Sequence, residues 1–209
     1  MLLLPTCFVL LLVALDHLAV AATNETEFTF NGFSGANLSL DGMATVTPAG
    51  LLMLTNGTAA LKGHAFYPTP LRFFHGAGTE MASFSTAFVF GIIGQYADVS
   101  SQGMAFLISP SRDFSTALPG HFLGLVNASD NGDARDHLLA VELDTVLNAE
   151  FQDIDDNHVG VDVNSLTSVR AASAGYYDDE TGSFRNLSLI SRKAMQVTSA
   201  AKKPQAVKH

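Results

Sequence analysis

The chain has 209 residues, a length that suits one domain with a hydrophobic core. Hydrophobic residues make up 47% of it and charged residues only 15%, which excludes a disordered polar chain. The net charge of −9 argues against nucleic acid or an anionic membrane surface as the main partner.

Residues 1–22 are predicted to be a secretory signal peptide. An apolar run from Leu2 to Leu15 precedes the small residues "AVAA" at 19–22, which offer an A-x-A cleavage site. The run is too short to span a membrane comfortably, and no later stretch is apolar for about 18 residues. We therefore expect a secreted or extracellular protein with no transmembrane segment in this chain. Cys7 is the only cysteine, so the mature protein would lack disulfides.

Five Asn-x-Ser/Thr sequons agree with a secretory route. Their asparagines are Asn24, Asn37, Asn56, Asn127 and Asn186. One such triplet is weak evidence because it arises by chance, but five beside a signal peptide predict a glycoprotein.

Short β-type runs follow one another from residue 27 and are separated by Gly, Pro, Asn and Asp. They cover residues 27–33, 50–57, 81–92, 103–110, 121–126, 137–145 and 158–165. This pattern, with no long 3.6-residue period after residue 22, predicts an all-β sandwich. Residues 198–209, "TSAAKKPQAVKH", are small, polar and basic, and we expect them to form a disordered tail.

The densest chemistry lies in residues 141–160, "VELDTVLNAEFQDIDDNHVG". Strand alternation places Glu142 and Asp144 on one face, about 7 Å apart. Asn148, Asp153 and His158 follow within the same stretch. Oxygen-rich ligands suit Ca²⁺, and carboxylates with one histidine suit Mn²⁺ or another first-row ion. A solvated acidic loop is the alternative, although unpaired charge inside an apolar strand is costly.

This stretch resembles the metal-binding segment of the legume (L-type) lectins, the concanavalin-A-like family, in the version found in the extracellular domains of plant lectin receptor kinases. Supporting stretches are "FTFNGFSGANLSLDGMA", "GHAFYPTPLRF", "FSTAFVFGI", "GMAFLISPS" and "FLGLVN". The resemblance implies a jelly-roll β-sandwich over residues 23–197. Family members continue with further strands, so we expect a sandwich that is incomplete at its C-terminus and exposes strand edges. Such a domain would be poorly soluble or depend on a partner.

The resemblance also implies two adjacent metal sites. The transition-metal ligands would be Glu142, Asp144, Asp153 and His158. The Ca²⁺ ligands would be Asp144, the backbone carbonyl of Val146, Asn148 and Asp153. In this family the metals shape a loop that holds a sugar, and they do no catalysis.

The sugar pocket implied by the resemblance is altered here. Gln102 stands where the family has an aspartate, and His121 stands where a glycine backbone N–H binds the sugar. Val146 replaces an aromatic ring, whereas the asparagine that binds both Ca²⁺ and sugar is retained as Asn148. An amide lacks the charge-assisted acceptor strength of a carboxylate. We expect glycans or glycoconjugates as partners, with weakened monosaccharide binding.

A hydrolase is one alternative. Some glycoside hydrolases share this sandwich and carry Glu-x-Asp-x-Glu, with the two catalytic carboxylates about 5 Å apart. Glu142 and Asp144 begin that pattern, but Val146 stands where the second catalytic carboxylate would be. The sequence also contains no kinase motifs, so we do not expect an enzyme.

A metal-stabilised extracellular interaction module is the other alternative. It would keep the metal ligands but bind a cell-surface protein or a peptide without recognising a monosaccharide. The altered sugar pocket beside a complete ligand set favours this hypothesis.

Overall fold

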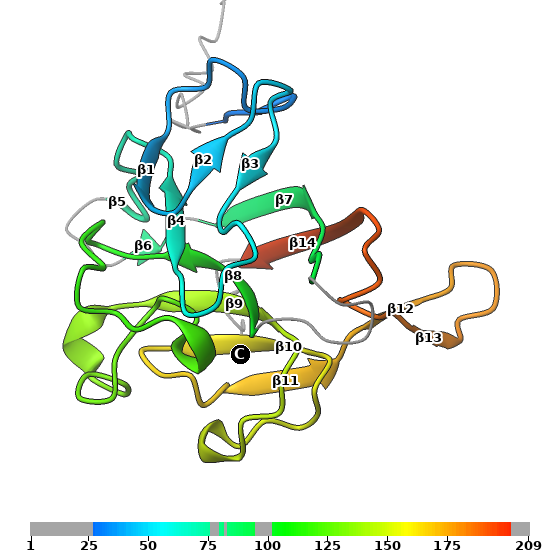
Figure 1. The fold of residues 1–209 in the computed structure, drawn as a ribbon. Coiled ribbons are helices and arrows are strands. Elements are labelled where there is room, and N and C mark those ends of the chain that lie inside the picture. Colours follow the sequence, from blue (N-terminus) through cyan, green and yellow to red (C-terminus); the bar gives the residue numbers. More distant parts are fainter. Residues whose placement is uncertain (1–26, 76–79, 82, 95–101, 202–209) are drawn as a thin grey trace, which may run out of the picture.

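A computed structural model of the chain describes residues 27–75, 80–81, 83–94 and 102–201. In these residues the regular structure consists of strands and short 3₁₀ turns, so the expected all-β class is confirmed (Figure 1). None of the described segments forms a helix long and apolar enough to cross a membrane. The predicted signal segment and Asn24 lie outside the described residues.

The first half of the chain forms three antiparallel strand pairs. β1 (Ser39–Gly42) pairs with β4 (Gly63–Phe66), β2 (Thr45–Val46) with β3 (Leu52–Met53), and β5 (Phe74–His75) with β6 (Glu80–Met81). Gly50 closes the β2–β3 turn with φ +82°, and its N–H donates to the Thr47 carbonyl over 2.8 Å. Glycine is suited to this position because it adopts positive φ without steric cost.

The central sheet has four antiparallel strands in the order β11-β10-β9-β8. They are β8 (Gly103–Ile108), β9 (Leu139–Asp144), β10 (His158–Val163) and β11 (Arg170–Ser173). The register places Glu142 opposite Gly160 and Asp144 opposite His158. Because side chains alternate across a strand, Glu142 and Asp144 share one face while Leu143 points to the other.

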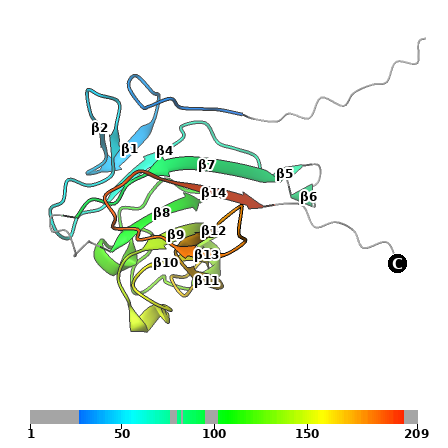
Figure 2. The same ribbon diagram turned by 90° about the vertical axis from the view of Figure 1, so that its right-hand side faces the viewer.

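Each face of the central sheet is covered by its own apolar cluster. On one face Leu143 packs with Phe90 of β7 (Phe84–Phe90) and with Met195 of β14 (Met195–Ala201). Figure 2 shows the paired strands β7 and β14 lying across the central sheet as a second layer. On the other face Ala140 packs against a cluster that includes residues of the 109–138 connection between β8 and β9. The fold is therefore a β-sandwich whose second face is covered by loops.

Four smaller elements complete the description. They are the 3₁₀ turns η1 (Gly120–Phe122), η2 (Ala134–Asp136) and η3 (Ala149–Phe151), and the hairpin β12 (Gly175–Tyr177) with β13 (Phe184–Asn186). The hairpin projects away from the rest of the domain (Figure 1). Its strands are joined by a ring contact between Tyr177 and Phe184, whose centroids are 5.3 Å apart.

The predicted domain boundary after Val197 is wrong. β14 continues through Ala201, which pairs with Phe84 of β7, so residues 198–201 are not a disordered tail. Their small and polar side chains carry no hydrophobic signal, but a strand is held by backbone N–H and C=O groups that every non-proline residue possesses. Residues 202–209 lie outside the described part of the chain.

Backbone atoms of neighbouring segments pack closely around Gly63. A Cβ atom added there would lie 1.9 Å from the Leu54 carbonyl oxygen and 2.8 Å from the Ala44 nitrogen. Since both atoms are backbone, we predict that Gly63→Ala lowers the free energy of unfolding by about 3 kcal/mol or more. Gly91→Ala is the control, because its Cβ would meet the Lys193 carbonyl at an ordinary 3.5 Å. Equal urea denaturation midpoints for the two variants would contradict this packing.

Candidate metal centre

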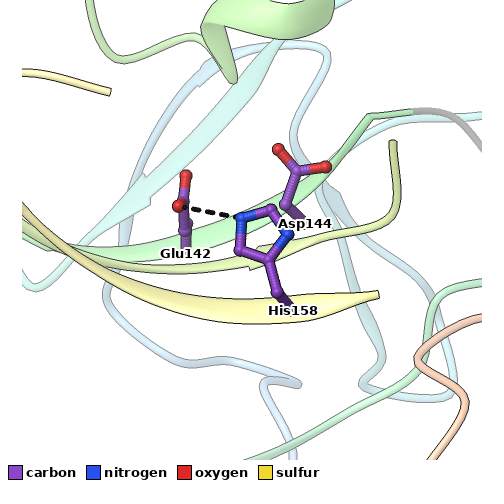
Figure 3. A group of neighbouring side chains, drawn as sticks. All are labelled: Glu142, Asp144 and His158. Carbon is purple, nitrogen blue, oxygen red and sulfur yellow. Dashed lines mark hydrogen bonds and ion pairs between the residues drawn. The ribbon is translucent and has the colours of Figure 1, made fainter. Parts of the chain in front are cut away.

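Three ionisable side chains meet at one end of the central sheet. Glu142 and Asp144 come from β9 and His158 from β10, and they offer ligand atoms that all lie within 4.8 Å of one another (Figure 3). Each of the three is only 1–2% exposed. A solvated acidic loop therefore does not describe these residues, because their charges are removed from water and require compensation.

Hydrogen bonds fix the orientation of the His158 ring. Its Nδ1 lies 2.8 Å from the backbone carbonyl oxygen of Asp155, which can only accept, so Nδ1 carries the donated proton. Nε2 then faces the carboxylates, 3.3 Å from Glu142 Oε1 and 3.9 Å from Asp153 Oδ1. Histidine ligands of metals are commonly held by such a carbonyl on the other ring nitrogen. The ring is thus presented as a metal ligand through Nε2.

Gly160 makes room for the Glu142 carboxylate. It lies directly opposite Glu142 in the sheet, and an added Cβ would come 2.2 Å from Glu142 Oε1 and 2.0 Å from Ser168 Oγ. A larger residue at 160 would displace the carboxylate from the centre. The sequence alone did not identify this glycine as part of the centre. The period of two along β10, which puts positions 158, 160 and 162 on the face of Glu142, was the available signal.

A third buried acid, Asp162, is linked to Glu142 through Ser168. Ser168 Oγ is 2.8 Å from Glu142 Oε1 and 2.6 Å from Asp162 Oδ1, and Asp162 is fully buried. Asp162 Oδ2 is a buried atom with no hydrogen-bond partner among the described residues. Burial and the nearby Glu142 charge raise the pKa of Asp162 to about 8. Ser168 and Asp162 had no predicted role, because both lie beyond residues 141–160.

The centre holds more carboxylates than positive charge. Burial raises the pKa of Asp144 to about 6, and the charges of Asp153 and Glu142 add to the effect. The hydrogen bond to Glu142 raises the pKa of His158 to about 9, despite the opposing effect of burial. One imidazolium offsets only one of these negative charges, whereas a divalent cation would offset two. The donor set therefore fits the transition metal implied by the sequence.

The loop after β9 gathers the other predicted ligands. The Val146 N–H donates to Asp144 Oδ1 over 2.7 Å, and the Asn148 N–H donates to Asp153 Oδ2 over 2.6 Å. The Asn148 side-chain amide donates to the Val146 carbonyl over 3.0 Å. The four residues predicted to hold Ca²⁺ thus contact one another, and carbonyl, amide and carboxylate oxygens are the ligand types that Ca²⁺ prefers.

Gln102 lies beside this loop. Its backbone carbonyl accepts a bond from the Thr145 N–H over 3.2 Å, and its side-chain Oε1 is 3.5 Å from Asn148 Nδ2. The structure therefore brings together two of the predicted sugar-binding residues, Gln102 just before β8 and Asn148 in the loop after β9.

His121 reaches the same loop from a different segment. It lies in η1, and its Nε2 is 3.4 Å from Oε1 of Glu150 in η3. Its ring also lies 5.7 Å from that of Phe151, which is buried in the core. His121 thus contacts the residues that follow Asn148 in the chain.

The family follows from a comparison with known domains. The profile of the legume lectin domain matches residues 25–200. The chain belongs to the legume lectin domain family. The family resemblance drawn from the sequence is thereby confirmed.

Plant receptor kinases are among the relatives of this lectin domain. It is 61% identical over 194 residues to the L-type lectin-domain containing receptor kinase SIT2 of Oryza sativa subsp. japonica, a match that covers 92% of this chain and 29% of that protein. It is 51% identical over 179 residues to receptor kinase IV.1 of the same type from Arabidopsis thaliana, covering 85% of this chain and 26% of that protein. The chain therefore spans less than a third of these relatives' length.

Solved lectin structures share the fold. Lectin II from Ulex europaeus superposes with a TM-score of 0.62 at 26% identity, covering 79% of this chain and 66% of that one. Peanut lectin with a nine-residue peptide also superposes with a TM-score of 0.62, at 25% identity, covering 83% and 88% of the two chains. The lectin β-sandwich expected from the sequence is confirmed.

The stability of the metal-free lectin domain should fall as pH rises from 5 to 9. The folded-state pKa values of Asp144, His158 and Asp162 are raised to about 6, 9 and 8, from 3.8, 6.5 and 3.8. The folded domain therefore binds these protons more tightly than the unfolded chain, and the resulting stability is lost as each group deprotonates.

Thermal melting in EDTA across this pH range checks the prediction. We expect the melting temperature to fall toward pH 9, and added Mn²⁺ with Ca²⁺ to restore it most strongly above pH 7, because metals bind deprotonated ligands. A melting temperature in EDTA that rises from pH 5 to 9 would show that these groups are not coupled to folding in this way.

Proposed function

We propose that this domain binds carbohydrate through Gln102, His121 and Asn148, next to a two-metal site that shapes their loop. The observation that carries the proposal is the buried convergence of Glu142, Asp144 and His158 at the start of the 145–157 loop. The family match supports it, because the chain belongs to the legume lectin domain family. Glycans or glycoconjugates are the proposed partners.

The metals are assigned by ligand chemistry. Glu142, Asp144, Asp153 and His158 would hold Mn²⁺ or another transition metal, which accepts mixed carboxylate and imidazole ligands. A neighbouring Ca²⁺ would be held by the oxygen ligands Asp144, the Val146 carbonyl, Asn148 and Asp153. When bound, these ions supply the positive charge that the buried acids lack. We propose no catalytic step for the domain.

The proposed sugar contacts come from amide and imidazole groups. The Gln102 and Asn148 amides can each donate to and accept from hydroxyl groups, and they lie 3.5 Å apart. The His121 side chain is 41% exposed, so its ring is available to a ligand beside Glu150. Val146 offers no ring for stacking on a sugar. We therefore expect weaker binding than a site with a carboxylate at 102 and an aromatic ring at 146 would give.

The domain is proposed to work outside the cell. Its relatives are named lectin-domain containing receptor kinases, and residues 1–22 have the features of a signal peptide. The sequons support the same route, and Asn37, Asn56 and Asn186 are exposed.

An interaction module without monosaccharide binding is the second candidate. Leu147 and Ile154, which flank the proposed ligands in the 145–157 loop, are 55% and 52% exposed. Exposed apolar side chains beside a rigid loop are suited to a protein or peptide partner. In this case the metals would still stabilise the loop.

A glycan array tests the proposed function. Wild-type protein with Mn²⁺ and Ca²⁺ should bind at least one class of glycan, and EDTA should abolish the signal. Asn148→Ala should weaken binding by at least about tenfold, since it removes a proposed ligand of both Ca²⁺ and sugar. Asn31→Ala, at an exposed asparagine outside the site, is the control. Calorimetric metal binding with an empty array would favour the interaction module.

Glycan occupancy should differ among the sequons. The Asn127 side-chain amide already donates to Asp130 Oδ2 over 2.7 Å and to the Thr116 carbonyl over 3.4 Å. A glycan on this nitrogen would replace one donor hydrogen and crowd both partners. We predict lower occupancy at Asn127 than at the exposed Asn37 and Asn186, measured by mass spectrometry of the secreted protein. Equal occupancy at all three would contradict the prediction.

A further inference from the structure

Lys62 makes an unusual set of contacts just before β4. Its Nζ lies 2.6 Å from the Phe114 carbonyl oxygen, 3.1 Å from that of Ser115 and 2.5 Å from that of Ala117. An ammonium group has three N–H donors, so all of them are used on the backbone of one loop. Hydrogen bonds from a charged donor are stronger than neutral ones. Lys62 therefore fixes the start of the 114–126 loop.

His64, two residues further along, holds the other end of the same loop. Its Nε2 lies 2.8 Å from the Gly124 carbonyl oxygen, so this nitrogen is the donor, and its Nδ1 lies 3.3 Å from Asp41 Oδ2. Gly124 packs against this ring, since an added Cβ would lie only 3.0 Å from His64 Nε2. Lys62 and His64 thus hold the 114–126 loop at two points about ten residues apart.

The 114–126 loop held at these two points carries His121. Within it the Leu118 N–H donates to the Val126 carbonyl over 2.8 Å, and the Gly124 N–H donates to the Leu118 carbonyl over 3.0 Å. These bonds close the loop, and His121 projects from it to within 3.4 Å of Glu150. A shift of the Lys62 end of the loop would therefore move His121 relative to the metal-site loop.

We propose that Lys62 is a positioning residue for ligand binding. It sets the position of His121 against the 145–157 loop without touching either the ligand or the metals. This proposal rests on the proposed function, because it names the residue that places one side of the same site. A lysine that only stabilised the fold would instead change metal and glycan binding together, through the folded fraction.

Lys62→Met is the main test, because it keeps the aliphatic stem and removes the ammonium group. Lys193→Met, at an exposed lysine, is the matched control. We expect Lys62→Met to retain calorimetric affinity for Mn²⁺ and Ca²⁺ within about twofold, and to lose glycan affinity by at least about tenfold. Unchanged glycan affinity, or equal losses of metal and glycan affinity, would overturn the proposal.

Hydrogen exchange tests the loop without relying on a glycan. The amides of Leu118 and Gly124 should exchange at least about tenfold faster in Lys62→Met, while those of β9 and β10 stay protected. If the wild-type protein bound no glycan, the proposed function would fail, and these amides would still decide whether Lys62 orders the loop. Unchanged protection at both amides would overturn the positioning role.

Two further variants separate the ammonium group from general folding. Lys62→Gln keeps two N–H donors. If Lys62→Met does not fold, Lys62→Gln takes its place, with the same expected changes in metal affinity, glycan affinity and amide exchange. Lys62→Cys, made with Cys7→Ser so that no other thiol is present, can be aminoethylated to rebuild a side chain ending in ammonium. We expect alkylation to restore glycan binding and loop protection. If the alkylated protein is folded but neither glycan binding nor loop protection returns, the Lys62 ammonium group does not position the loop.

Discussion

The burial of like charges on one face of the central sheet is the constraint on which this domain depends. Glu142, Asp144 and Asp162 are each no more than 2% exposed, and His158 is their buried cationic neighbour. Carboxylates removed from water must be protonated, hydrogen-bonded or matched by positive charge. All three responses are present: raised pKa values, the Ser168 hydroxyl between two acids, and a ligand geometry that fits a divalent ion.

The same constraint explains how one sheet serves both stability and function. Leu143 faces an apolar layer made by β7 and β14, while its neighbours Glu142 and Asp144 face the polar centre. The centre lies where β9 ends and β10 begins, so the 145–157 loop starts and finishes at candidate metal ligands. Holding both ends of a loop at a rigid site limits its conformations, which lowers the entropy cost of presenting binding groups.

The proposed binding surface is assembled from three separate segments. Gln102 comes from the residue just before β8, Asn148 from the loop after β9, and His121 from a loop anchored by Lys62. Each segment is positioned by hydrogen bonds to other residues, so replacements at the ligand-facing positions can change specificity while the candidate metal centre and the sandwich are kept. This separation is typical of functions carried on loops of a stable scaffold.

Sequence alone determined the all-β class and the lectin family, and it predicted the set of metal ligands, because strand alternation and ligand spacing are local patterns. It did not identify Gly160, Ser168 or Asp162 as parts of the centre, and it ended the domain at Val197, although β14 runs to Ala201. Only the tertiary structure could decide these points, since they depend on which strands lie side by side. The contact of Lys62 with the Phe114 carbonyl, 52 residues away, has the same origin. No local sequence pattern predicts a bond to a distant backbone atom, because every residue offers the same carbonyl group.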